Sequence, residues 1–201
     1  MVAAPQRAVA FRPVPPASEP PETHQATDSA VIVAIREAEA VVASHRCRFD
    51  AAAAWGVPAH VTILYPFVEP AALTDEVVDR LREAVGAFPP FVCAFKEARW
   101  FGQDVLWLAP DPATPFRAMT EGVVRAFPAQ LPYGGAFGNE VVPHLTVAET
   151  RLASSVDEVA AVEEQVLPLL PFDAPVTEAL LIAGTALPDS WCVVAHLPLR
   201  A

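Results

Sequence analysis

Hydrophobic and polar residues alternate along two short stretches of the chain, HVTIL and HLTVA. Successive side chains of an extended strand point to opposite faces, so this alternation predicts two β-strands that each have an apolar and a polar face. His60 and Thr62 share the polar face of the first strand, and His144 and Thr146 share that of the second. We therefore expect each strand to carry an imidazole and a hydroxyl over a packed core.

Apolar residues that recur with a helical period predict four amphipathic helices. Thr74, followed by acids in the first turn, is a candidate N-cap for one of them, and Ser155 with Glu158 three residues later forms a capping-box pattern for another. Thr114 before Pro115 is typical of a cap with proline at the first helical position. The four segments are about 37–45, 74–88, 114–127 and 155–170.

Runs of β-branched and aromatic residues predict further strands. Two of these strands are separated by only three residues, which implies an antiparallel hairpin. Residues 46–59 are expected to form a connection, because Gly56 and Pro58 stop a helix from continuing out of the alanine run. The predicted strands are about 30–35, 91–101, 105–108, 176–183 and 191–197.

The chain contains a degenerate internal repeat of a histidine strand, an amphipathic helix, a proline-phenylalanine pair and a hairpin with tryptophan. Histidine and threonine are the polar residues that recur in register at both strand starts. The repeat predicts an α+β fold of two lobes related by approximate two-fold symmetry. Residues 29–201 are expected to form this domain, after a proline-rich tail of residues 1–28 that cannot bury enough apolar surface to fold.

The composition narrows the class of ligand and the location. Hydrophobic residues make up 53% of the 201-residue chain, which is ample for a core, whereas the formal net charge is −11. That charge argues against a broad basic surface for duplex nucleic acid and leaves room for a small phosphorylated ligand. No run reaches the roughly 18 apolar residues of a membrane span, and the three cysteines are far apart, as is typical of reduced thiols. We expect a cytoplasmic monomer that does not bind membranes.

Two imidazoles on neighbouring strands are suited to acid–base chemistry at phosphorus. An unperturbed histidine pKa of about 6.5 lets one ring accept a proton and the other donate one near neutral pH. The hydroxyls of Thr62 and Thr146 can donate hydrogen bonds to non-bridging phosphate oxygens. Such a site needs neither a metal nor another cofactor. The candidate aromatic residues for stacking against a base are Tyr65, Tyr133 and Phe137, followed by Phe67, Trp100 and Trp191.

The stretches GVPAHVTILYPF and YGGAFGNEVVPHLTVAE resemble the two H-hydrophobic-T/S motifs of the 2H phosphoesterases, also called the 2′-5′ RNA ligase superfamily. The resemblance implies a bilobal fold of two antiparallel sheets flanked by helices, with the motifs facing each other across a cleft. It also implies that His60 and His144 are the acid and base, and that Thr62 and Thr146 bind phosphate oxygens. The substrate that it implies is a cyclic phosphodiester, such as a 2′,3′-cyclic nucleotide, an RNA end or ADP-ribose 1″,2″-cyclic phosphate.

The sequence leaves other interpretations open. A non-catalytic nucleotide-binding or regulatory module would keep the same cleft without turnover, and some members of the resembling family ligate RNA instead. A metal site on the two histidines is disfavoured, because the nearest acids, Glu69 and Glu149, are not at ligand spacing. The sequence does not fix which histidine is the base.

Overall fold

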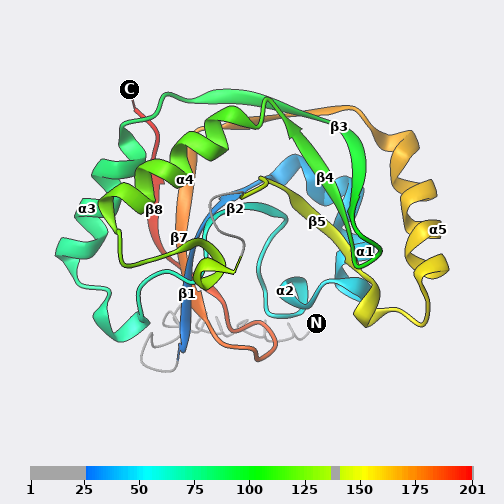
Figure 1. The fold of residues 1–201 in the computed structure, drawn as a ribbon, viewed down its shortest axis with the longest axis horizontal. Helices are drawn as coiled ribbons and strands as arrows, with labels where there is room; N and C mark the ends of the chain where they lie inside the picture. The colour runs from blue at the N-terminus through cyan, green and yellow to red at the C-terminus, as the bar shows by residue number, and fades with distance from the viewer. Residues whose placement is uncertain (1–25, 137–140, 201) are drawn as a thin grey trace, which may run out of the picture.

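Two four-stranded antiparallel sheets form the framework of the protein (Figure 1). The computed structural model describes residues 26–136 and 141–200. Most of the expected proline-rich tail lies outside the described residues, as does Phe137, one of the candidate aromatic residues. The α+β class and the two antiparallel sheets flanked by helices are confirmed.

Each sheet has one strand of the histidine motifs at its edge. Across the first sheet the strands are, in order, β2 (His60–Leu64), β1 (Asp28–Ala34), β7 (Glu178–Gly184) and β8 (Cys192–Pro198). Across the second sheet they are β5 (Leu145–Glu149), β4 (Val105–Asp111), β3 (Phe91–Phe101) and β6 (Phe172–Val176). The sequence pattern does not predict β6 as a strand of its own.

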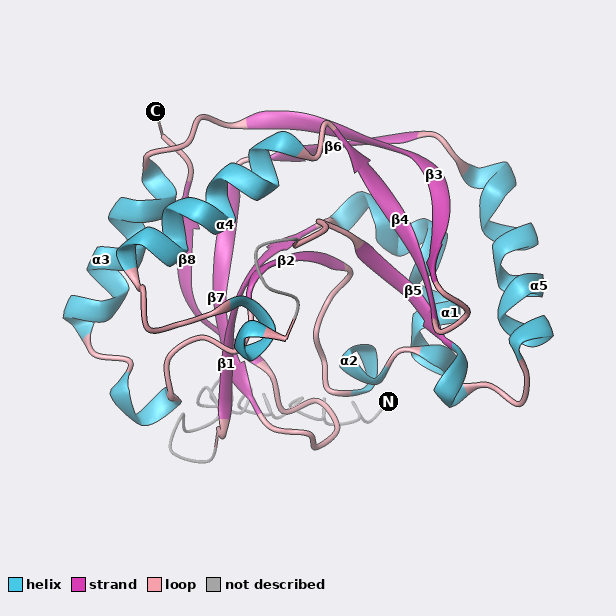
Figure 2. Ribbon diagram, viewed as in Figure 1, coloured by secondary structure: helices cyan, strands magenta, loops and turns pink. Residues whose placement is uncertain are grey.

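Each sheet also combines parts of both halves of the repeat. The β3–β4 hairpin follows the first histidine strand in the sequence but pairs with β5, whereas the β7–β8 hairpin joins β2 through β1. β2 and β5 contact each other in the middle of the molecule (Figure 2). The two expected lobes are present, but neither is built from one repeat alone. Pulling the two halves of the chain apart would therefore disrupt both sheets.

Helices flank both sheets and share one core with them. α3 (Asp75–Gly86) and α4 (Thr114–Ala126) pack on each other and contact β8 and β2 respectively, whereas α1 (Glu39–Phe49) and α5 (Val156–Val166) contact β5. The short α2 (Ala51–Ala54) follows α1. A continuous cluster of buried side chains joins these helices to both sheets, which fixes β2 relative to β5. The 3₁₀ helices are Arg36–Ala38, Pro70–Ala72, Pro132–Gly135, Thr150–Leu152 and Leu167–Leu169.

Two of the expected helix caps are confirmed and a third is wrong. Thr74 Oγ1 accepts a hydrogen bond from the backbone N–H three residues later at 3.4 Å, and Ser155 Oγ accepts one from Glu158 N at 3.3 Å. α4 begins at Thr114 itself, so Thr114 is not its cap. Ala113 occupies the N-cap position and has no side-chain oxygen to offer.

The connection expected at residues 46–59 is wrong in its first part. α1 continues to Phe49, and α2 follows, capped by Asp50, whose Oδ1 accepts a hydrogen bond from Ala52 N at 2.9 Å. Arg46, in the last turn of α1, is buried in an ion pair with Asp50, a contact that a local sequence pattern does not reveal. From Val57 the chain leads into β2 without regular structure.

Gly184 ends β7 against the side chain of Trp191. A Cβ atom at Gly184 would lie 2.5 Å from Trp191 Cγ and 2.7 Å from Trp191 Cα, so alanine fits only if the backbone moves. Gly184→Ala is expected to lower the free energy of unfolding by about 1–3 kcal/mol, measured by urea denaturation. Gly86→Ala is the control, because a Cβ atom there meets nothing closer than 3.7 Å. Equal stability of the two variants would contradict this packing.

Candidate active site

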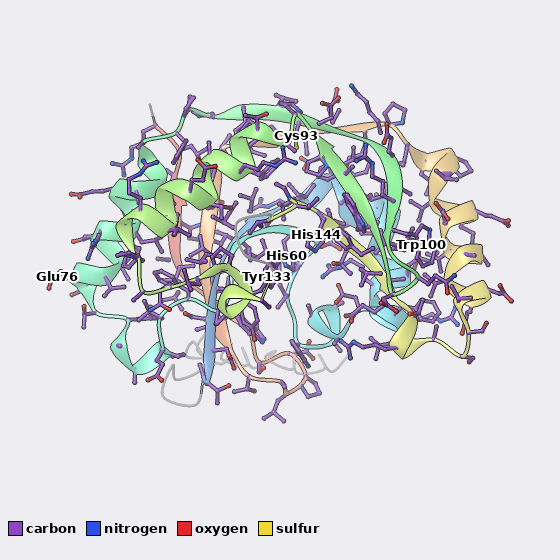
Figure 3. All side chains as sticks on the ribbon, viewed as in Figure 1. His60, Glu76, Cys93, Trp100, Tyr133 and His144 are labelled. Carbon is purple, nitrogen blue, oxygen red and sulfur yellow. The ribbon has the colours of Figure 1, made fainter. Side chains whose placement is uncertain are left out.

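The two histidine motifs lie next to each other at the facing edges of the two sheets. Figure 3 shows His60 and His144 side by side, His60 at the start of β2 and His144 directly before β5. In both motifs the histidine and the threonine are partly exposed, and the apolar residues between and after them are buried. The structure thus brings His60, Thr62, His144 and Thr146 to one place, with the face assignments that the alternation predicts.

Both imidazoles are held in the same way by the backbone. His60 Nδ1 lies 2.8 Å from the carbonyl oxygen of Pro58, and His144 Nδ1 lies 2.8 Å from that of Val142. A carbonyl oxygen only accepts, so Nδ1 is the protonated nitrogen of each neutral ring. The Nε2 atom of each ring is therefore the one left for proton transfer.

The surroundings of both rings favour their neutral form. The pKa of His60 is lowered to about 4, first by burial and then by the charges of Arg46 and His144, against the hydrogen bond to Pro58. Burial also lowers the pKa of His144, against its hydrogen bond to Val142. Both rings of the free protein are therefore mainly neutral at pH 7, and a bound anion would raise both pKa values.

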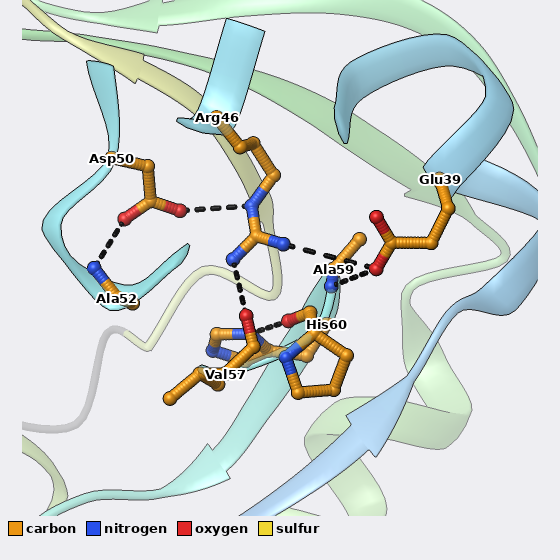
Figure 4. Close-up of polar contacts among 8 residues, drawn as sticks. Glu39, Arg46, Asp50, Ala52, Val57, Ala59 and His60 are labelled. Carbon is orange, nitrogen blue, oxygen red and sulfur yellow. Dashed lines mark hydrogen bonds and ion pairs between the residues drawn. The ribbon is translucent and has the colours of Figure 1, made fainter. Parts of the chain in front are cut away.

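A buried ion pair supports the segment that leads into β2. Arg46 and Asp50, 2% and 5% exposed, pair through Nε and Oδ2 at 2.9 Å (Figure 4). Arg46 Nη2 donates to the carbonyl oxygen of Val57 at 3.1 Å, and Glu39 Oε1 accepts from Ala59 N at 2.7 Å. The sequence pattern did not indicate this cluster, because no local signal distinguishes the buried Arg46 from the exposed Arg48.

Tyr133 connects the loop before the second motif to the first motif. Its side chain shares a hydrogen bond with Thr62, and burial raises the pKa of its hydroxyl. Its backbone N–H donates to the carbonyl oxygen of Tyr65 at 2.6 Å, where β2 has just ended. Tyr133 adopts a φ of +51°, which is uncommon for a residue with a Cβ atom. The two motifs are thus linked through one aromatic residue at the site.

A cavity of about 600 Å³ opens beside His144 and Thr146. Tyr133 and Phe101 line it, and the Phe101 ring meets the His144 ring edge-on at 5.0 Å between centroids. Glu149 and Asp104 line it as well. The volume and the mixture of aromatic and polar side chains suit a nucleoside-sized ligand. The sequence pattern did not indicate Phe101 or Asp104 as site residues, because strand alternation alone does not show that they face this cavity.

The other candidate aromatic residues lie away from this cavity. Phe67 is buried in the core at 4% exposure. Trp100 Nε1 donates to Glu163 of α5 at 2.8 Å, and Trp191 Nε1 donates to the carbonyl oxygen of Thr185 at 2.9 Å. Tyr65 is exposed, and its ring lies 6.4 Å from that of Trp191. Of the described aromatic candidates, only Tyr133 therefore lines the cavity.

Neither a metal cluster nor a membrane-spanning helix is found in the part of the chain that the structure describes. Residues 26–136 and 141–200 hold no group of three or more His, Cys, Asp or Glu side chains that could bind a metal ion. No helix within these two ranges is long and apolar enough to cross a membrane.

The sequence model of the 2′-5′ RNA ligase superfamily matches residues 20–185. The chain belongs to this superfamily. The resemblance of the two motifs to those of the 2H phosphoesterases is thereby confirmed, and membership supports a phosphoesterase-like or ligase-like enzyme. No curated protein sequence matches the chain significantly.

Solved structures share the fold of this superfamily member at low sequence identity. A protein of Thermus thermophilus, TT0787, is 16% identical with a TM-score of 0.62, over 87% of this chain and 98% of that one. Escherichia coli LigT in complex with 3′-AMP is 15% identical with a TM-score of 0.55, over 88% of this chain and 100% of LigT. A structure described as a phosphoesterase is 14% identical with a TM-score of 0.53, over 88% of this chain and 100% of that one.

Proposed function

We propose that this protein is a metal-independent phosphoesterase that hydrolyses a cyclic phosphodiester by acid–base catalysis with two histidines. The observation that carries the proposal is the pair of matched imidazoles, each with Nδ1 held by a carbonyl oxygen two residues earlier and Nε2 left for chemistry. Membership of the 2′-5′ RNA ligase superfamily supports the same class of reaction. His60, Thr62, His144 and Thr146 are the proposed catalytic residues.

The proposed reaction is an in-line displacement at phosphorus. One imidazole removes a proton from water through Nε2 as the water oxygen forms a bond to phosphorus. The other imidazolium donates its Nε2 proton to the ribose oxygen as the bond from that oxygen to phosphorus breaks, which opens the ring to a phosphomonoester. The hydroxyls of Thr62 and Thr146 donate hydrogen bonds to the non-bridging oxygens, where charge develops. Proton exchange with solvent then resets both rings.

The proposed substrate is a small phosphorylated nucleotide or the end of an RNA. The cavity beside His144 has room for a nucleoside, with Phe101 and Tyr133 as the aromatic walls. Glu149 and Asp104 add acceptors that suit hydroxyl or amino groups of a nucleoside. LigT has been solved in complex with 3′-AMP, ATP and NADP⁺, which is consistent with a nucleotide site on this fold.

A panel of cyclic phosphates tests the proposal. The panel holds the four nucleoside 2′,3′-cyclic phosphates, an oligoribonucleotide that ends in a cyclic phosphate, and ADP-ribose 1″,2″-cyclic phosphate, each with and without EDTA. We expect turnover of at least one compound at a rate that EDTA does not change. Nucleotide binding without turnover of any compound would contradict the proposal and favour the non-catalytic module. Joining of RNA ends would identify ligase activity.

Removal of either threonine hydroxyl is expected to slow the reaction. Thr62→Val and Thr146→Val each lose a hydrogen bond to a charged phosphate oxygen, worth about 1.5–3 kcal/mol, so kcat should fall by about 10- to 100-fold. Steady-state kinetics on the best substrate measure the effect. Thr27→Val serves as the control, because its hydroxyl bonds to Asp28 outside the two motifs. Unchanged kcat in both motif variants would contradict the proposed role of the hydroxyls.

A further inference from the structure

The two imidazoles have matched backbone contacts but different electrostatic surroundings. Among the lysines and arginines that the structure describes, Arg46 alone is buried. It contacts the segment that leads to His60, through the carbonyl oxygen of Val57 (Figure 4). The ring of His144 instead packs against aromatic side chains, with the Phe101 centroid at 5.0 Å and the Trp107 centroid at 6.0 Å. A buried cation therefore lies near His60, whereas neutral aromatic rings contact His144.

Arg46 and Glu39 hold the backbone on both sides of Pro58. The guanidinium donates to the carbonyl oxygen of Val57 at 3.1 Å, and the Glu39 carboxylate accepts from Ala59 N at 2.7 Å (Figure 4). Pro58 lies between these two contacts, and its carbonyl oxygen accepts the His60 Nδ1 proton. The position of that carbonyl, and with it the tautomer of His60, therefore depends on the Arg46 cluster.

The charged groups around His60 come from three elements. α1 and the residue after it provide Glu39, Arg46 and Asp50, with Arg46 and Asp50 paired at 2.9 Å and Glu39 Oε1 at 4.0 Å from Arg46 Nη1. The second motif provides His144, and the preceding loop provides Tyr133, which reaches the first motif through Thr62. Arg46 and His144 are the groups whose charge opposes a proton on His60.

We propose that Arg46 is a positioning residue that keeps His60 neutral with its proton on Nδ1, so that His60 is the general base and His144 the general acid. The proposal rests on the phosphoesterase function proposed above. Binding of an anionic phosphate stabilises an imidazolium at either ring, but at His60 the buried guanidinium opposes this effect. The single proton that the site needs then resides on His144, because the cation on that side, Arg99 over the Trp107 ring, is exposed to solvent and not buried.

Titration of the histidine imidazoles by ¹⁵N NMR tests the electrostatic part without any substrate. In the unmodified protein we expect Nδ1–H tautomers for both rings and a lower titration midpoint for His60 than for His144. Arg46→Met should raise the His60 midpoint by about one pH unit or more, because it removes a nearby like charge, and should leave His144 nearly unchanged. Arg46→Lys should restore most of the low midpoint.

Two further variants keep this test decisive. Arg46→Met leaves the buried Asp50 carboxylate unpaired, so Arg46→Met/Asp50→Asn removes both charges. The double variant should still show an upward shift of the His60 midpoint, but a smaller one, because no unpaired carboxylate remains to favour the imidazolium. Arg48→Met is the matched control, because Arg48 lies on the same helix but is exposed and paired with Glu158 at 3.0 Å. An unchanged His60 midpoint in a folded Arg46 variant, or an equal shift in Arg48→Met, would overturn the proposal.

The pH dependence of kcat/KM tests which histidine is the base. The acid limb of this profile reports the base of the free enzyme, so Arg46→Met should move the acid limb to higher pH and leave the alkaline limb in place. A shift of the alkaline limb alone would make His60 the acid and overturn the assignment. Absence of turnover by the unmodified protein would overturn the proposed function and the assignment with it, while the NMR titration would still decide whether Arg46 controls the state of His60.

Discussion

Replacement of His60 or of His144 by alanine is expected to lower kcat/KM on the best cyclic phosphodiester by about 10²- to 10⁴-fold, because each variant would lose one partner of the proposed proton transfer. The double variant should be little slower than either single variant, since the two rings act as a unit. Steady-state kinetics at several pH values measure the loss. We expect the circular dichroism spectra of the variants to match that of the unmodified protein, because both side chains are partly exposed and neither belongs to the buried core.

His196→Ala is the control for these two variants. His196 is an exposed strand histidine whose Nδ1 pairs with Glu178 at 2.9 Å, outside the two motifs. Its replacement should leave kcat/KM unchanged. Near-normal turnover by both motif variants would show that the two imidazoles are not the acid and base. A large loss in His196→Ala alone would place the chemistry elsewhere in the protein.

Replacement of Asp50 by alanine is expected to reduce the free energy of unfolding by about 3–5 kcal/mol, because it leaves the Arg46 guanidinium buried without its partner. The two side chains are only 4% and 3% exposed, so water cannot solvate the charge that remains. The same change removes the cap of α2, where Asp50 Oδ1 accepts from Ala52 N at 2.9 Å. Urea denaturation followed by tryptophan fluorescence measures the loss.

The exposed ion pair between Lys96 and Asp111 is the matched comparison for Asp50. Lys96 Nζ lies 2.7 Å from Asp111 Oδ2, but the two side chains are 57% and 60% exposed, so solvent screens the pair. Asp111→Ala should therefore leave the urea midpoint close to that of the unmodified protein. If Asp50→Ala were as stable as Asp111→Ala, the buried ion pair would not support the first motif as described.

The placement of the four motif residues could be predicted from the sequence because it depends on local geometry. Strand alternation alone puts His60 with Thr62 and His144 with Thr146, and the repeat indicates that the two strands belong together. The caps of α3 and α5 are local in the same sense, since Thr74 and Ser155 each bond three residues ahead.

What the sequence did not predict depends on contacts between distant segments. α1 continues beyond its expected end with Arg46 buried in its last turn, and no local pattern distinguishes Arg46 from the exposed Arg48 two residues later. Each hairpin belongs to the sheet that holds the histidine strand of the other half of the chain. Alternation of polar and apolar residues does not specify which strands pair, so the sequence pattern could not predict this arrangement. Phe101 and Asp104 face the cavity because the β3–β4 hairpin pairs with β5 and not with β2.

The proposed hydrolysis can be followed by ³¹P NMR of adenosine 2′,3′-cyclic phosphate, or of the best compound in the panel, with EDTA-treated protein. In the proposed mechanism one fixed imidazole protonates the leaving oxygen, so we expect conversion to a single phosphomonoester isomer at a rate that EDTA does not affect. The His60→Ala/His144→Ala variant should leave the cyclic phosphate intact over the same time. No conversion of any cyclic phosphate, a mixture of isomers, or conversion that requires added metal would contradict metal-independent catalysis by the two histidines.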